Sequence, residues 1–303
     1  MPGPIFVLAA AVLWGLIGIQ SAVLLDAGVT PYEISFWRAM IAGALFAAYA
    51  SMTGGLKLPR GRDIPMLGLF ALLGVTLFYT AYALAVEAGG VSLAAILLYT
   101  APAIVAVLAH LTLGERLTGL KIGLVAITLV GVVLVSLGGG GGVTVTAAAI
   151  GWGLASAVGY SSYYLIGKWA LRRWTAPAMY AVVLPIGGLA LLPWVTFADK
   201  GAREWLFIAT LAVFSTFFAY AFYAAGLARM QASKAVVVAT IEPVVAALSG
   251  VLLLGERLGL WGLIGGACVV LAAAAAGGGG RRSGRRSGRR RRDGNRPAGP
   301  AQP

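Results

Sequence analysis

Three ionisable side chains in otherwise apolar stretches of this sequence are candidates for chemistry: Arg38, His110 and Glu242. A charged side chain costs about 2.5–3.5 kcal/mol near the centre of a hydrocarbon layer, so each one needs a partner or a role. Glu242 precedes Pro243, whose ring and missing N–H loosen a helix. The Glu242 carboxyl group could exchange a proton, pair with a ligand amine or bind Arg38. Arg38 could hold a ligand carboxylate or only pair with Glu242, and His110 suits a structural or interfacial role.

Two pairs of tyrosines repeat one spacing. Tyr79 and Tyr82 are three residues apart, hence on one helix face, and Tyr220 and Tyr223 repeat them 141 residues later. A belt at the membrane surface is the simpler explanation, but these positions lie only roughly 6–10 Å from the middle of their stretch. We therefore expect them to line a cavity, where aromatic rings with hydroxyl groups suit amphipathic solutes and cationic groups. Further candidates for this lining are Tyr99, Trp14, Trp152 and Tyr163.

The elements that carry these residues are membrane spans. The chain has 303 residues, of which 60% are hydrophobic and only 11% charged, far from the composition of a soluble domain. Apolar stretches of roughly 20 residues are long enough to cross a bilayer as helices, and no alternating pattern of a membrane β-barrel is present. The sequence predicts an all-α polytopic membrane protein with ten transmembrane helices, at about 4–25, 33–52, 64–86, 92–113, 119–137, 147–167, 176–196, 205–227, 233–254 and 260–276.

An internal repeat organises these spans. The tetrapeptide LGER occurs at residues 113–116 and again at 254–257, and the same shift of 141 relates Pro102 to Pro243. Five spans per repeat is an odd number, so the second repeat must enter the membrane upside down. We expect a first repeat at 1–137, a glycine-rich junction at 138–146, a second repeat at 147–276 and a disordered basic tail at 277–303. Kinks at Pro102 and Pro243 would be flexible points.

The LGER tetrapeptide is expected to be scaffold. Its glycine suits the left-handed cap that ends one helix, its glutamate suits the positive N-terminal end of the next helix, and its arginine can reach the headgroups. Basic residues set the orientation: with the amino terminus inside, nineteen lie in inside loops and the tail, against three outside. Both termini are therefore expected in the cytoplasm. We expect the arginine-rich tail to lie on anionic lipid and not on nucleic acid.

Several stretches resemble the EamA-type carriers of the drug/metabolite transporter superfamily. They are "AVLWGLIG", "FWRAMIAGAL", "APAIVAVLAHLTLGERLTGLKIG" and "IEPVVAALSGVLLLGERLGLWGLIGG", within roughly residues 4–276. The resemblance implies ten helices in two inverted five-helix repeats, a central cavity, and frequently the export of amino acids or other metabolites. The glycine run and the arginine tail are not part of the family pattern.

Function then divides into a few classes. A secondary transporter of small organic metabolites, such as an amino-acid exporter in a bacterial inner membrane, is the first. A carrier of sugars or phosphorylated solutes is an alternative, although phosphate cargo would need several buried basic residues and only Arg38 qualifies. A membrane-embedded lipid-phosphate enzyme would need clustered acids, histidines or metal ligands, and the chain has one histidine and scattered acids. We expect no cofactor and no metal, and either a homodimer or intrachain packing at Gly262-x-x-x-Gly266.

Overall fold

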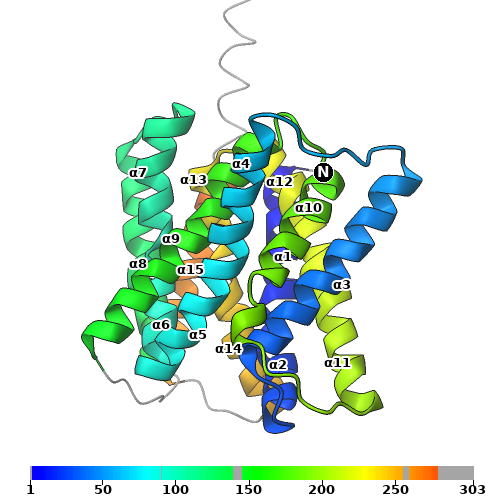
Figure 1. Ribbon diagram of the computed structural model, residues 1–303. Coiled ribbons are helices and arrows are strands. Elements are labelled where there is room, and N and C mark those ends of the chain that lie inside the picture. The colour runs from blue at the N-terminus through cyan, green and yellow to red at the C-terminus, as the bar shows by residue number, and fades with distance from the viewer. Residues whose placement is uncertain (1, 90, 139–144, 255–258, 279–303) are drawn as a thin grey trace, which may run out of the picture.

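The computed structural model describes residues 2–89, 91–138, 145–254 and 259–278. Within these ranges the chain is helical and contains no strand (Figure 1). The first part comprises α1 (Gly3–Gly15), α2 (Ile17–Asp26), α3 (Pro31–Met52), α4 (Asp63–Phe70), the π-helix η1 (Ala71–Leu77), α5 (Phe78–Gly89), α6 (Val91–Leu98), α7 (Ala101–Leu113) and α8 (Gly119–Gly138). The second comprises α9 (Ala147–Ala170), α10 (Ala176–Leu189), the short η2 (Leu192–Trp194), α11 (Ala202–Ala212), the π-helix η3 (Val213–Phe218), α12 (Ala219–Arg229), α13 (Ala232–Ala239), α14 (Glu242–Leu254) and α15 (Leu260–Gly278).

Six segments of the described chain are long and apolar enough to cross a membrane. They are Gly3–Asp26, Pro31–Met52, Asp63–Gly89, Leu93–Leu113, Ala176–Trp194 and Ala202–Arg229. Two shorter apolar helices cover Gly119–Val135 and Leu260–Ala276. The protein is thus an all-helical polytopic membrane protein. Most of the predicted glycine-rich junction and nearly all of the basic tail lie outside the described residues.

Local sequence signals fix where several helices begin. The hydroxyl oxygens of Thr30, Thr146 and Thr175 accept hydrogen bonds from the backbone N–H three residues later, which caps α3, α9 and α10. Pro31 then occupies the first turn of α3, where its missing N–H costs nothing. Between α6 and α7, and again between α13 and α14, the helix is interrupted just before Pro102 and Pro243.

Small residues bring helices from the two parts of the chain together. α8 packs along α15 so closely that a Cβ atom on Gly265 would lie 2.5 Å from the carbonyl oxygen of Gly131. α3 packs along α10, where a Cβ atom on Gly43 would lie 2.6 Å from Cγ of Pro185. α1 packs on α12, and α5 packs on α9. Each of these pairs joins a helix of the first part of the chain to one of the second, so the two parts form one bundle.

The bundle has two distinct ends. In Figure 1 the N-terminus, the loop of residues 53–62 and the end of α7 lie at the upper end, and α2 and α14 lie at the lower end. We call the upper end the N-terminal face and the lower end the opposite face.

Candidate functional site

A cavity of about 860 Å³ lies in the middle of the bundle and extends toward the opposite face. Leu25, Pro31 and Val86 belong to its lining and stand near helix ends on that side. Its wall comes from nine α-helices and from the break before α7. The lining residues are Trp14, Gly15, Ile17, Gly18, Ser21, Leu25, Pro31, Ile34, Ser35, Arg38, Phe78, Tyr79, Tyr82, Ala83, Val86, Ala95, Leu98, Tyr99, Val135, Tyr160, Tyr163, Tyr220, Glu242, Pro243 and Ala246.

Most of the residues singled out from the sequence stand in this wall. The structure brings together Trp14, Arg38, Tyr79, Tyr82, Tyr99, Tyr163, Tyr220, Glu242 and Pro243. Three others lie elsewhere. Tyr223 is fully buried behind the wall, with its ring centroid 5.3 Å from that of Trp14. Trp152 is 40% exposed and contributes nothing to the lining, and Pro102 is buried in the first turn of α7.

The breaks between α6 and α7 and between α13 and α14 place two polar side chains in the cavity wall. Tyr99 stands between α6 and α7, and Glu242 is the first residue of α14. Discontinuous helices that meet near the middle of the membrane are a recurrent way to present polar groups to a transported solute. The two prolines therefore matter to the site through the breaks that they accompany.

A chain of tyrosine hydroxyls runs along one side of the cavity. The hydroxyl oxygens of Tyr79 and Tyr220 are 2.9 Å apart, and those of Tyr220 and Tyr163 are 3.0 Å apart. The hydroxyl of Tyr164 donates to the Tyr160 oxygen at 2.9 Å. These contacts satisfy hydroxyl groups that would be costly to bury alone. They also present a wall that can both donate and accept hydrogen bonds.

Arg38 is held from two directions. Its Nε donates a hydrogen bond to the Thr216 hydroxyl oxygen at 3.1 Å, and Thr216 donates to the carbonyl oxygen of Leu211 at 3.0 Å. The Arg38 guanidinium also lies over the Tyr79 ring, 5.6 Å from its centroid, which is a cation–π geometry. Within the described part of the chain, Nε alone makes a hydrogen bond. The terminal nitrogens of the guanidinium are thus available to a carboxylate.

Glu242 is the carboxylate of this cavity. Tyr99, Tyr160 and Arg38 line the same cavity as this carboxylate. One cation and one carboxylate therefore share a space that is lined mainly by aromatic and apolar residues. Such a space can neutralise both ends of a zwitterion, or a single amine or carboxylate.

Sequence reasoning missed two members of the site. Tyr160 is three residues before Tyr163, the spacing that singled out Tyr79 and Tyr82, so its position on the same helix face could have been found. Thr216 carried no such signal, because its role depends on η3 packing against α3.

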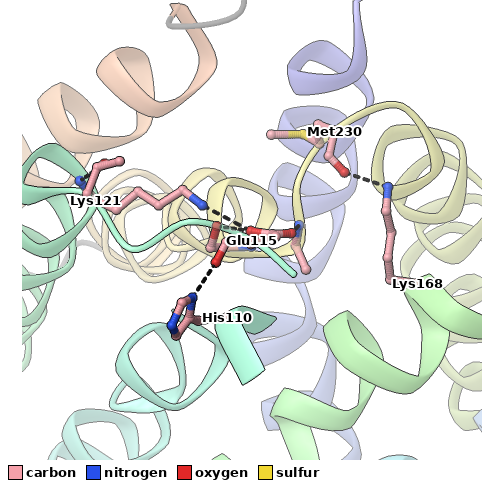
Figure 2. Close-up of polar contacts among 8 residues, drawn as sticks. His110, Glu115, Lys121, Lys168 and Met230 are labelled. Carbon is pink, nitrogen blue, oxygen red and sulfur yellow. Dashed lines mark hydrogen bonds and ion pairs between the residues drawn. The ribbon is translucent and has the colours of Figure 1, made fainter. Parts of the chain in front are cut away.

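The N-terminal face is closed by polar contacts that Figure 2 shows. The carboxylate of Glu115, in the loop between α7 and α8, accepts hydrogen bonds from the Ser233 hydroxyl and from the backbone N–H of Ala232 at 2.7 Å. Lys121 Nζ lies 3.1 Å from the same carboxylate. His110 contacts the Glu115 carbonyl oxygen through Nδ1 at 2.8 Å and is exposed. The Glu115 carboxylate thus ties the loop between α7 and α8 to the start of α13.

This arrangement tests the expectations for the first LGER copy. Gly114 ends α7 in the left-handed conformation with φ +69°, as predicted. The Glu115 carboxylate contacts the N-terminal end of a helix, as predicted. The predicted helix was the next one in the chain, α8, and this is wrong, because the backbone N–H that donates belongs to Ala232 of α13. The N-cap residue of α13, Gln231, provides no side-chain cap. In the second copy, residues 255–257 lie outside the described residues.

Among the residues that the structure describes, no group of three or more His, Cys, Asp or Glu side chains could hold a metal ion. The polar groups of the cavity are instead suited to hydrogen bonding and charge pairing with an organic solute.

Comparison with protein families matches the model of the EamA-like transporter family to residues 1–137 and 147–277. A solved structure titled "Crystal structure of protein" superposes with a TM-score of 0.78 at 20% identity and covers 90% of this chain and 97% of its own. That likeness concerns the fold alone.

The relatives are named as transporters. An "Uncharacterized transporter" of Archaeoglobus fulgidus is 28% identical over 260 residues, which cover 84% of this chain and 89% of the relative. The "Uncharacterized inner membrane transporter YicL" of Salmonella typhimurium is 26% identical over 263 residues, 84% of this chain and 87% of the relative. A "Probable terminal-alkyne amino-acid exporter" of Streptantibioticus cattleyicolor is 27% identical over 243 residues, 77% of this chain and 80% of the relative. Transporters, and not enzymes, are thus the proteins that this chain resembles.

Proposed function

Because the chain belongs to the EamA-like transporter family, we propose that it is a secondary transporter that exports amino acids or similar amphipathic metabolites by alternating access. The observation that carries the choice of cargo is the presence of Arg38 and Glu242 in one cavity among tyrosines. An amino acid offers a carboxylate for the guanidinium and an ammonium group for the carboxylate and the aromatic faces. The printed name of the Streptantibioticus cattleyicolor relative supports the same class.

The proposal includes a topology. Ten transmembrane helices form two inverted five-helix repeats, residues 1–137 and 147–276, in a bacterial inner membrane with both termini in the cytoplasm. The excess of basic residues on the predicted inside supports this orientation. The basic tail lies on anionic lipid, and a homodimer stays a prediction.

The mechanism follows from the two ends of the bundle. With the N-terminus in the cytoplasm, the cavity faces outward in this structure, and the contacts of Glu115 hold the cytoplasmic end shut. Rocking of one repeat against the other would break these contacts and open the cavity to the cytoplasm, where the solute enters for export. The breaks beside Pro102 and Pro243 provide helix ends that can change angle without unfolding a continuous helix.

Transport by the purified protein tests this. We would reconstitute the protein into liposomes and measure uptake of labelled amino acids and sugars, with and without unlabelled solute trapped inside. Saturable amino-acid uptake that trapped amino acid accelerates is the expected result. Trp152→Phe is the control variant and should transport as the wild type does, because Trp152 lies outside the cavity wall. Saturable flux of sugars or sugar phosphates, with none for any amino acid, would overturn the proposed cargo.

A further inference from the structure

A second and smaller pocket lies on the N-terminal face, away from the central cavity. Its volume is about 190 Å³. It is bounded by the start of α8, the start of α13 and the end of α15, which pack against one another. Its lining comprises Arg116, Thr118, Leu120, Lys121, Leu124, Gln231, Ser233, Lys234, Val237, Ala275 and Ala276.

Positive charge dominates the rim of this pocket. Arg116, Lys121 and Lys234 all line it. Lys121 is paired with Glu115 at 3.1 Å. Neither Arg116 nor Lys234 has a carboxylate within ion-pair distance among the residues that the structure describes. Two cations on one rim without a counter-charge in this part of the chain raise the local positive potential, which an anion would relieve.

Uncharged hydrogen-bond donors complete the rim. The Thr118 hydroxyl oxygen accepts the Lys121 backbone N–H at 3.3 Å, which leaves its own hydrogen free to donate. Gln231 is exposed and contributes an amide N–H₂ group. A tetrahedral group with several oxygens, such as a phosphate, can use guanidinium, ammonium, hydroxyl and amide donors together.

The floor of the pocket is apolar and joins the outer surface of the bundle. Leu124, Val237 and Ala276 are buried there, and Leu120 is 66% exposed at its edge. From this edge the exposed side chains of α8 and α15 continue as an apolar surface, with Ile122, Ile127, Val130, Leu263, Val270 and Leu271 among them. Surfaces of this kind on spanning helices face acyl chains. A phosphate held at the rim would therefore have hydrocarbon directly beneath it.

We propose that this pocket binds the phosphate group of an anionic lipid, with the acyl chains lying against α8 and α15. Basic pockets between helices at a membrane face have the chemistry that lipid headgroups require. The proposal does not depend on the cargo of the central cavity. A free phosphate ion shares the headgroup's charge but would gain nothing from the apolar floor.

The test is lipid binding by the purified full-length protein in detergent at about 0.15 M salt, where charges farther apart than about 8 Å are largely screened. The probes are phosphatidylglycerol, phosphatidylcholine and inorganic phosphate, and the readout is the affinity of each, measured by native mass spectrometry or by the shift in melting temperature. The variants are Arg116→Gln, Lys234→Gln and their combination. Lys121 is left unchanged because it also contacts Glu115. The matched control is Arg172→Gln, another exposed cation of the N-terminal face that does not line the pocket.

Phosphatidylglycerol should bind more tightly than phosphatidylcholine, and each rim cation removed should weaken it on the order of fivefold. Arg172→Gln should leave the affinity unchanged, and the basic tail contributes equally to every variant. The proposal is overturned if the combined variant binds phosphatidylglycerol as wild type does. Equal affinity for inorganic phosphate and phosphatidylglycerol, both lost in the variant, would overturn the lipid as the source of the phosphate. Lys234→Arg should keep the binding, since it retains the charge.

Discussion

Removing the carboxylate of Glu115 should open the N-terminal face. In the structure this carboxylate takes the place of the missing side-chain cap of α13, through the Ala232 N–H and the Ser233 hydroxyl. Loss of a helix cap costs about 1–2 kcal/mol, and a partly exposed ion pair such as the one with Lys121 adds under about 1 kcal/mol. Glu115→Ala should therefore shift the equilibrium toward the open form by about 2 kcal/mol, or roughly 30-fold.

Alkylation of a buried cysteine measures this shift. The single native cysteine, Cys268, is first replaced by serine. Val236 of α13, which is 0% exposed near the closed end, is then changed to cysteine and treated with a water-soluble maleimide. Where opening and closing are fast relative to alkylation, the rate follows the population of the open form and should rise roughly 30-fold on Glu115→Ala. The matched control is Glu204→Ala, because the Glu204 carboxylate caps only its own helix through the Gly201 N–H. Equal rates in the Glu115 variant and its parent would refute the closing role of Glu115.

Four further outcomes follow from the same geometry. Burial by itself raises the pKa of the Glu115 carboxyl, but hydrogen bonds from Ser233, Lys121 and Ala232 outweigh it and hold the pKa below its ordinary value of 4.5. The stabilisation is therefore complete above pH 4.5 and is lost as the pH falls through the lowered pKa. Because the thiolate is the form that reacts, the alkylation rate of the Val236→Cys protein is divided by the rate of a free thiol at the same pH. This ratio should stay constant down to about pH 5 and rise only in stronger acid; a rise between pH 8 and 6 would contradict this. Arg38→Gln should weaken the apparent affinity for an amino acid by roughly 10- to 100-fold, since a charged hydrogen-bond partner is lost, and unchanged affinity in counterflow would remove Arg38 from the binding site. Glu242→Gln should abolish any dependence of amino-acid flux on an imposed pH gradient while counterflow persists, and a fully retained dependence would exclude Glu242 as the coupling group. Gly265→Ala should destabilise the protein by about 1–3 kcal/mol in thermal unfolding, because the new Cβ would lie 2.5 Å from the Gly131 carbonyl oxygen, whereas Gly123→Ala, with nothing within 4 Å, should not.

The sequence predicted apolar helices and the cap at Gly114 because these signals are local. The apolar stretches and the LGER glycine are each read within one helix or one turn, and the structure has helices and a left-handed glycine at these places. The contact of Glu115 with Ser233 joins residues 118 positions apart. Nothing in the loop itself indicates that partner. The error over which helix Glu115 caps therefore reflects a tertiary contact and not a misread motif.

The cavity shows a second limit of sequence reasoning. The sequence made both Trp14 and Trp152 candidates for the cavity lining, yet Trp14 is 7% exposed in the cavity wall and Trp152 is 40% exposed outside it. Residue type alone does not indicate which tryptophan the fold turns toward the cavity. Likewise Tyr220 and Tyr223 share a helix face, but three residues turn a helix by 300°, so their side chains point about 60° apart. One lines the cavity and the other packs behind it.

The contact between Tyr79 and Tyr220 differs from the contacts of Glu115 in its position within the bundle. These tyrosines are 141 residues apart, the same shift that relates the LGER copies, and their hydroxyl oxygens are 2.9 Å apart. Two equivalent residues can touch only beside the axis that would relate the two repeats. In the proposed rocking mechanism a contact at this axis would move little and would persist whichever end is open. The Glu115 contact lies far from the centre, at one end of the bundle, and the proposed rocking would break it. These two contacts are the parts that the proposed alternating access requires: a fixed polar centre and an end that can be released.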